Sequence, residues 1–208
     1  MTTDTCNINI QQVAESRISE LDYNNIQFGT IFSDHMLVVD YENGAWQTPQ
    51  ILPYGNLSLS PATSAIHYGQ SIFEGMKAYR NDAGETVLFR PLDNHKRLNK
   101  SAVRMCMPEI PEDIFVQGLS QLLQLDKQWV PPTDGCALYI RPFMFATDDF
   151  IGVRPSSKYK FIISWRPYLI AGMAEDNSIT KFSGDCCAWV VDNAILESFL
   201  EFCFIYFG

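Results

Sequence analysis

Four basic residues lie within nine positions of a chain that is acidic overall: Lys96, Arg97, Lys100 and Arg104. On a helix, positions 96, 100 and 104 share one face, whereas Arg97 is rotated about a quarter-turn from Lys96. A solvated helix face explains the lysines. Arg97 points another way and could form a bidentate pair with a phosphate, because a guanidinium offers parallel N–H donors. Spacing alone leaves both interpretations open for Arg97.

The segment LYIRPF places Tyr139 and Arg141 two residues apart on an expected strand. Side chains alternate along a strand with period 2, so both point to the same face. The arginine there either pairs with a buried carboxylate or binds the carboxylate of a ligand. The residues support the two interpretations about equally.

A histidine–tyrosine pair, His67 and Tyr68, lies in the stretch SAIHYGQSIFEGMKAYR. Such a pair more often serves packing than catalysis. The sequence contains no Ser-His-Asp arrangement, metal-ligand spacing or glycine-rich phosphate loop that would indicate a hydrolase or a nucleotide-binding protein.

Periodicity and turn signals predict the elements that position these residues. The pattern predicts a helix from Pro91 to about position 105, because proline is tolerated in the first helical turn. A second helix follows within 108–130, with Phe115, Leu119, Leu122 and Leu123 on one face. Strands are expected at 36–41, 76–80, 86–90, 135–146 and 158–165, with a turn at Asn43-Gly44 and a hairpin over 76–90.

This order indicates an α+β fold with a mostly antiparallel sheet and two helices, because it does not alternate strand and helix throughout. We expect a polar tail over 1–25 and a small domain over 26–167. The segment 168–208 is expected to be a divergent remnant of a second domain. Its apolar C-terminal run is interrupted by Asp192, Glu197 and Glu201, so it matches a membrane span poorly.

Composition narrows the class of protein. A formal net charge of −9 argues against a nucleic-acid-binding protein. The six cysteines contain no C-x-x-C pair, which favours reduced thiols used as small apolar side chains. The N-terminus lacks a basic region followed by an apolar run. We therefore expect a cytoplasmic protein without membrane association, with an organelle as the open alternative.

Several segments together resemble one family. They are FGTIFSDHML, NLSLSPATSAIHYGQSIFEGMKAYR, LFRPLDNHKRLNKSAVRM, LDKQWVP and LYIRPFMF with GVRPSSKYKFII. In order and spacing, from about Phe28 to Ile163, they resemble the N-terminal half of branched-chain amino-acid aminotransferases, which are pyridoxal 5'-phosphate enzymes of fold type IV. The resemblance implies transfer of the amino group of leucine, isoleucine or valine to 2-oxoglutarate, as in branched-chain amino-acid biosynthesis.

The resemblance also implies roles for matching residues. Arg97, in HKRL, falls where the family binds the cofactor phosphate, and Arg141 falls where it accepts the distal carboxylate of glutamate. The GVRP loop, with Val153, resembles a loop that reaches into the neighbouring subunit's site, which implies a homodimer. The implied substrate-binding residues are Phe28, Tyr68, Phe73, Tyr139, Arg141 and Val153.

The resemblance ends before the family's catalytic lysine. Lys181, in TKFSGD, loosely matches the family's lysine-x-x-glycine-asparagine pattern and is a weak candidate for the Schiff-base lysine. It follows Arg141 by only forty residues, so coincidence is the favoured interpretation. We therefore expect a truncated or divergent C-terminus and an incomplete enzyme.

Two alternatives to this assignment stay open. One is another fold type IV enzyme, such as a D-amino-acid aminotransferase or an aminodeoxychorismate lyase. The other is a non-catalytic domain that only dimerises.

Overall fold

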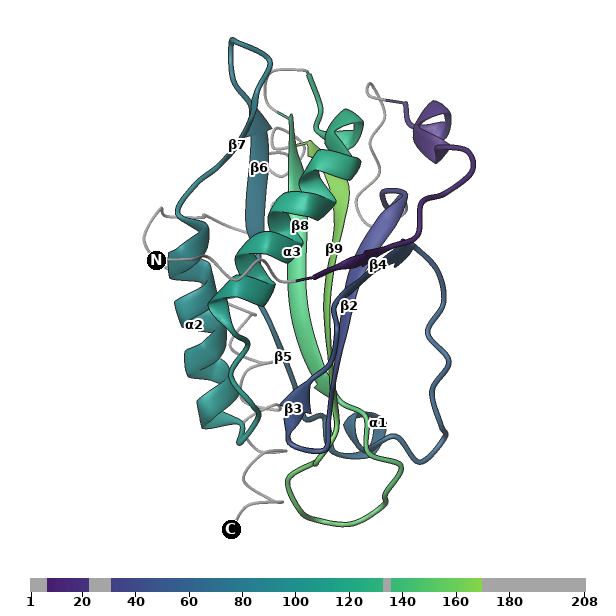
Figure 1. The fold of residues 1–208 in the computed structure, drawn as a ribbon, viewed down its shortest axis with the longest axis vertical. Helices are drawn as coiled ribbons and strands as arrows, with labels where there is room; N and C mark the ends of the chain where they lie inside the picture. Colours follow the sequence, from purple (N-terminus) through teal and green to yellow (C-terminus); the bar gives the residue numbers. More distant parts are fainter. Residues whose placement is uncertain (1–6, 23–30, 133–135, 170–208) are drawn as a thin grey trace, which may run out of the picture. The chain divides into compact units, whose positions relative to one another are not determined.

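The computed structural model describes residues 7–22, 31–132 and 136–169. In these ranges one sheet carries two long helices, α2 and α3, against one of its faces (Figure 1). The described elements all belong to the first of two compact units, Met1–Glu175, while the second unit, Asp176–Gly208, lies outside the described residues. The predicted boundaries at 25/26 and 167/168 stay predictions.

The described strands are β1 (Asn9–Ile10), β2 (His35–Glu42), β3 (Ala45–Trp46), β4 (Gln50–Pro53), β5 (Ser71–Phe73), β6 (Met76–Arg80), β7 (Thr86–Leu88), β8 (Cys136–Ala146) and β9 (Tyr159–Leu169). The α-helices are α1 (Ser64–Tyr68), α2 (Pro91–Arg104) and α3 (Glu112–Leu125). Two short 3₁₀ helices are η1 (Arg17–Glu20) and η2 (Lys127–Trp129). The predicted helices, hairpin and strands are confirmed, with β9 extending further than expected.

The strand order is β1-β4-β2-β9-β8-β6-β7, with β3 added to β2 and β5 added to β8. The described pairs are antiparallel except β1 with β4, which is parallel. β8 and β9 pair over their full length, from Cys136 opposite Leu169 to Ala146 opposite Tyr159. The α+β fold with a mostly antiparallel sheet is therefore as predicted.

The sheet separates its side chains by alternation. Odd-numbered residues of β2, such as Leu37 and Val39, join the main core with α2 and α3. Even-numbered residues of the same strand, Met36 and Val38, form a smaller cluster on the opposite side of the sheet. We call that side the second face.

The two long helices bury the residues that the 3.6-residue period selects. In α3 the predicted set of Phe115, Leu119, Leu122 and Leu123 is buried. Gly118, one turn from Leu122, lets the helix approach β2 closely: a Cβ there would lie 2.5 Å from Leu37 Cδ2. The β2–β3 connection uses Asn43 and Gly44 with φ of 54° and 77°, as the predicted hairpin turn requires.

The N-terminal stretch differs from the expected solvated tail. Asn9 pairs with Gln50 through β1 and β4, and η1 lies beside the start of β2. The link is Asp34, a side chain 1% exposed. It accepts hydrogen bonds from Ser16 Oγ at 2.5 Å, from the Arg17 N–H at 2.8 Å and from Trp129 Nε1 at 2.8 Å. A polar stretch is therefore ordered by a carboxylate that the sequence pattern does not reveal.

A second buried carboxylate, Asp126, completes this end of the sheet. It lies 2.6 Å from His35 Nδ1 and accepts the Trp165 Nε1–H at 3.1 Å. It also accepts the backbone N–H of His35 at 3.1 Å. Because buried polar groups are costly when unpaired, these contacts join β2, β9 and the C-terminus of α3.

In the part of the chain that the structure covers, no helix combines the length and the apolar character needed to cross a bilayer.

Replacing Asp34 with asparagine should lower the free energy of unfolding at pH 7 by about 2 kcal/mol, because the amide nitrogen would face N–H donors. Burial acts to raise the pKa of Asp34, but hydrogen bonds from Ser16, Arg17 and Trp129 outweigh it and hold the pKa below 3.8. The ionised carboxylate therefore stabilises the fold above about pH 4, and this contribution is lost as the pH falls through the lowered pKa.

Urea unfolding at pH 7 and pH 3 checks this, with Asp82→Asn in an exposed turn as the control. The gap between Asp34→Asn and wild type should narrow at pH 3. Equal unfolding free energies at pH 7 would show that Asp34 is not the link.

Candidate functional site

The segment Phe73-Glu74-Gly75, from the end of β5 toward β6, contacts two arginines, Arg97 and Arg141. The Glu74 N–H donates to the Pro142 carbonyl oxygen at 2.8 Å, which fixes the segment to β8. Phe73 contacts Arg141 and Glu74 contacts Arg97. Consecutive residues thus hold the two guanidiniums that the sequence singled out.

Arg97, on α2, makes a bidentate pair with Glu74. Its Nε lies 2.6 Å from Oε1 and its Nη2 lies 2.6 Å from Oε2. Glu74 is 7% exposed and Arg97 is 44% exposed, so a buried carboxylate holds a half-exposed guanidinium. Asn94, one turn earlier on α2, donates to Glu74 Oε2 at 3.1 Å. Such a two-point contact fixes the orientation of the guanidinium plane.

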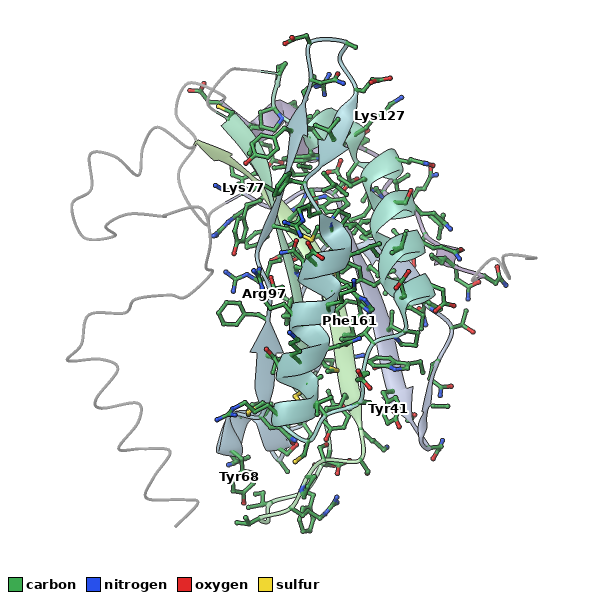
Figure 2. The ribbon with its side chains drawn as sticks, turned by 90° about the vertical axis from the view of Figure 1, so that its left-hand side faces the viewer. Tyr41, Tyr68, Lys77, Arg97, Lys127 and Phe161 are labelled. Atoms are coloured by element: carbon green, nitrogen blue, oxygen red, sulfur yellow. The ribbon has the colours of Figure 1, made fainter. Side chains whose placement is uncertain are left out.

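The bidentate geometry predicted for Arg97 is therefore present, but with a carboxylate of the same chain. A guanidinium bound side-on through Nε and Nη2 directs its Nη1 edge away from that partner. The side chains of Lys96 and Lys100 are exposed, as expected for a solvated helix face. In Figure 2 Arg97 lies at mid-height on the side of the molecule that carries Lys77 and Tyr68.

Phe73, Tyr139, Arg141 and Arg166 form the Tyr139 cluster on the second face. Arg141 Nη2 donates to Tyr139 Oη at 2.7 Å. The Arg141 guanidinium lies 4.3 Å from the centroid of the Phe73 ring and 5.3 Å from that of Tyr139. Arg166 lies over the same Tyr139 ring at 5.4 Å. The predicted shared face of Tyr139 and Arg141 is confirmed by this contact.

The surroundings of Arg141 bear on the two interpretations of this residue. Its Nη2 donates to the Tyr139 hydroxyl, and the face of its guanidinium packs on the Phe73 ring. Its Nε is buried and has no hydrogen-bond acceptor among the residues that the structure describes. A buried donor without an acceptor calls for an explanation, and a ligand carboxylate is one.

Tyr68 lies apart from the Tyr139 cluster. It ends α1, is 39% exposed and lies near one end of the molecule in Figure 2, well below Arg97. Its neighbour His67 has Nε2 2.8 Å from the Pro61 carbonyl oxygen, which is a local packing contact. The stretch from Ser64 to Phe73 is the expected helix-to-strand joint, turned by Gly69 at φ 66°.

Val153 lies in the loop between β8 and β9 and is 80% exposed. Asp148 braces the loop by accepting from Ser157 N at 2.9 Å and by pairing with Arg154 Nη1 at 3.0 Å. Burial acts to raise the pKa of Asp148, but the Ser157 and Arg154 contacts lower it overall. The backbone N–H of Ser64 donates to the Asp148 carbonyl oxygen at 2.9 Å, which ties this loop to α1.

Two further predicted residues, Phe28 and Lys181, lie outside the described residues. Sequence reasoning also missed two residues that the structure places at the site, Glu74 and Arg166. Glu74 carries a weak signal, since it is an acid among apolar residues of a predicted strand region. Arg166 gives no local signal, because its position depends on which residue of β8 it faces.

Comparison with known proteins identifies relatives of this chain, although no family model matches it. Branched-chain-amino-acid transaminase 1 of Bacillus subtilis is 49% identical over 147 residues, which is 70% of this chain and 41% of that protein. A probable branched-chain-amino-acid aminotransferase of Staphylococcus epidermidis is 47% identical over 154 residues, covering 74% and 43%. The chain thus spans about two fifths of the length of these relatives.

Solved structures were also matched. The branched-chain amino acid aminotransferase of Escherichia coli is 24% identical, with a TM-score of 0.49 over 65% of this chain and 41% of that one. The branched-chain aminotransferase of the archaeon Thermoproteus uzoniensis, solved with norvaline, is 19% identical, with a TM-score of 0.48 over 64% and 41%.

Gly75 provides the space that the Tyr139 phenol occupies, because a Cβ there would lie 2.7 Å from Tyr139 Oη and 3.3 Å from Cζ. Gly75→Ala should therefore destabilise the protein by about 1–2 kcal/mol, as overpacking does. The cost should shrink in a Tyr139→Phe background, which lacks the closest atom.

A double-mutant cycle by urea unfolding measures this coupling. Gly55→Ala is the control, since its Cβ would meet only the Pro53 carbonyl oxygen at 4.0 Å. An equal cost with and without the Tyr139 hydroxyl would contradict the contact.

Proposed function

Because this chain belongs to the branched-chain-amino-acid aminotransferase family, we propose that it forms the substrate side of an enzyme that transfers the amino group of leucine, isoleucine or valine to 2-oxoglutarate. One observation carries this proposal: two consecutive residues each contact an arginine. Glu74 pairs with Arg97, and the ring of Phe73 packs against Arg141. One suits a phosphate and the other a carboxylate. The names of the relatives give no support to a D-amino-acid aminotransferase or a lyase.

Arg97 fits the phosphate end of pyridoxal 5'-phosphate. Its guanidinium is half-exposed and its plane is fixed by Glu74. Glu74 acts as a positioning residue, because it aligns Arg97. When bound, the cofactor supplies an electron sink that stabilises negative charge at the substrate Cα.

The substrate side is assigned to the Tyr139 cluster. Phe73 and Tyr139 supply apolar surface for a branched side chain, and Arg141 supplies a cation at its edge for the acidic co-substrate. Phe28 is proposed to extend the apolar wall. Tyr68, which ends α1 apart from the Tyr139 cluster, is proposed to contact the substrate from there. Lys181 is the candidate for the catalytic lysine that cofactor trapping tests.

Cofactor trapping tests the proposal. The chain is incubated with pyridoxal 5'-phosphate, reduced with borohydride and mapped by peptide mass, after cofactor affinity is measured by absorbance. Arg97→Gln should weaken cofactor binding about tenfold or more, because charge-assisted contacts to phosphate are lost. Arg104→Gln, an exposed residue at the end of α2, is the matched control.

Removing Arg97 alone leaves the Glu74 carboxylate buried without its partner, so the double variant Glu74→Gln with Arg97→Gln separates folding from binding. It should recover stability without recovering cofactor affinity. Label on Lys181 would identify the catalytic lysine, and label on no lysine would reduce the chain to a non-catalytic domain.

We also propose a cytoplasmic homodimer in which the loop carrying Val153 reaches the neighbouring subunit. Ile151 and Val153 are 63% and 80% exposed, and apolar side chains so exposed favour an interface.

Val153→Asp should shift the protein from dimer to monomer in light scattering, whereas Val103→Asp, exposed on α2, should not. A monomeric wild type, or a Val153→Asp variant that dimerises with unchanged affinity, would contradict the proposed interface.

A further inference from the structure

Tyr139 has a basic residue opposite it on both neighbouring strands. In the sheet register Lys77 of β6 faces Tyr139 from one side and Arg166 of β9 faces it from the other. Side chains of directly opposed residues lie on the same face, with Cβ atoms about 4.5–5.5 Å apart. Arg141 follows two residues along β8. Three basic residues therefore neighbour Tyr139 on one face of the sheet, in a chain whose net charge is −9.

Contacts and charge confirm that Arg166 belongs to this surface. Its guanidinium lies 5.4 Å from the Tyr139 ring centroid, nearly the same distance as that of Arg141 at 5.3 Å. Tyr54 packs on the same second face. Burial raises the pKa of the Tyr54 phenol, while the positive charges of Arg17 and Arg166 act in the opposite direction.

The N–H donors of a guanidinium lie in one plane, and packing against an aromatic ring fixes that plane. Two of these donors can then pair with the two oxygens of a carboxylate. The buried Nε of Arg141, without an acceptor in the described ranges, is a donor that such an anion would satisfy.

We propose that Arg166 is a second carboxylate-binding residue, which acts with Arg141 beside Tyr139 to select a dicarboxylate over a monocarboxylate. This inference rests on the proposed function, because the acidic co-substrate of that reaction is a dicarboxylate of five carbons. Arg166 lies past Ile163, the last residue of the segments that resemble the family, so the resemblance assigns it no role.

The test measures binding of glutarate and pentanoate to the full chain by calorimetry at low ionic strength. The two probes have the same carbon number and differ in one carboxylate. Wild type should bind glutarate about tenfold more tightly than pentanoate. Arg166→Gln should remove about tenfold of the glutarate affinity and leave pentanoate unchanged. Arg104→Gln, which makes the same chemical change on an exposed helix, should alter neither.

Arg166→Lys keeps the charge and the aliphatic stem, and it tests the proposal if the glutamine variant fails to fold. It should bind glutarate about threefold more weakly than wild type, because an ammonium lacks the planar fork. Wild-type affinity in this variant would overturn the proposal, as would equal effects of Arg166→Gln and Arg104→Gln. Tighter Arg166-dependent binding of inorganic phosphate than of glutarate would also overturn it.

The outcomes separate this inference from the proposed function. Binding of glutarate requires neither the cofactor nor a catalytic lysine. Loss of cofactor trapping with intact Arg166-dependent glutarate binding would contradict the transaminase proposal alone. Intact trapping with glutarate binding that ignores Arg166 would contradict this inference alone.

Discussion

The antiparallel pairing of β8 with β9 is the constraint on which both faces of the sheet depend. Its register sets Ile140 opposite Trp165 in the core and Tyr139 opposite Arg166 on the second face. A shift of one residue in either strand would exchange the two sets, because side chains alternate. The apolar residues that must be buried therefore also determine which polar side chains meet on the other side.

The two arginines of the site are held in different electrostatic states. Arg97 is matched by the Glu74 carboxylate, so its orientation is well defined while much of its charge is compensated. Arg141 lies against the Phe73 ring and a phenol, which support the guanidinium without neutralising it. The first arrangement favours positioning of a ligand, and the second favours attraction of an anion. The proposed function would use both properties, because it pairs a phosphorylated cofactor with an acidic substrate.

The features that could be predicted from sequence are those that repeat along one element. Helical periodicity identifies the buried face of α3, and strand alternation places Tyr139 beside Arg141. The partner of Arg97 could not be predicted, since Glu74 precedes it by 23 residues and meets it only across β5 and α2. Arg166 depends on the register of a neighbouring strand. Pairing between distant parts of the chain thus determines which side chains meet at the site, whereas local pattern determines the helices and strands that carry them.

The two buried carboxylates described above each accept the N–H of an indole, Asp34 from Trp129 and Asp126 from Trp165. Both rings are almost fully shielded from water, at 0% and 1% exposure. One ring adjoins the N-terminal stretch and the other lies within β9. Trp46 is a third tryptophan of the described domain. Variants that keep Trp129 or Trp165 as the single tryptophan would therefore report separately on release of that stretch and on opening of the central strands.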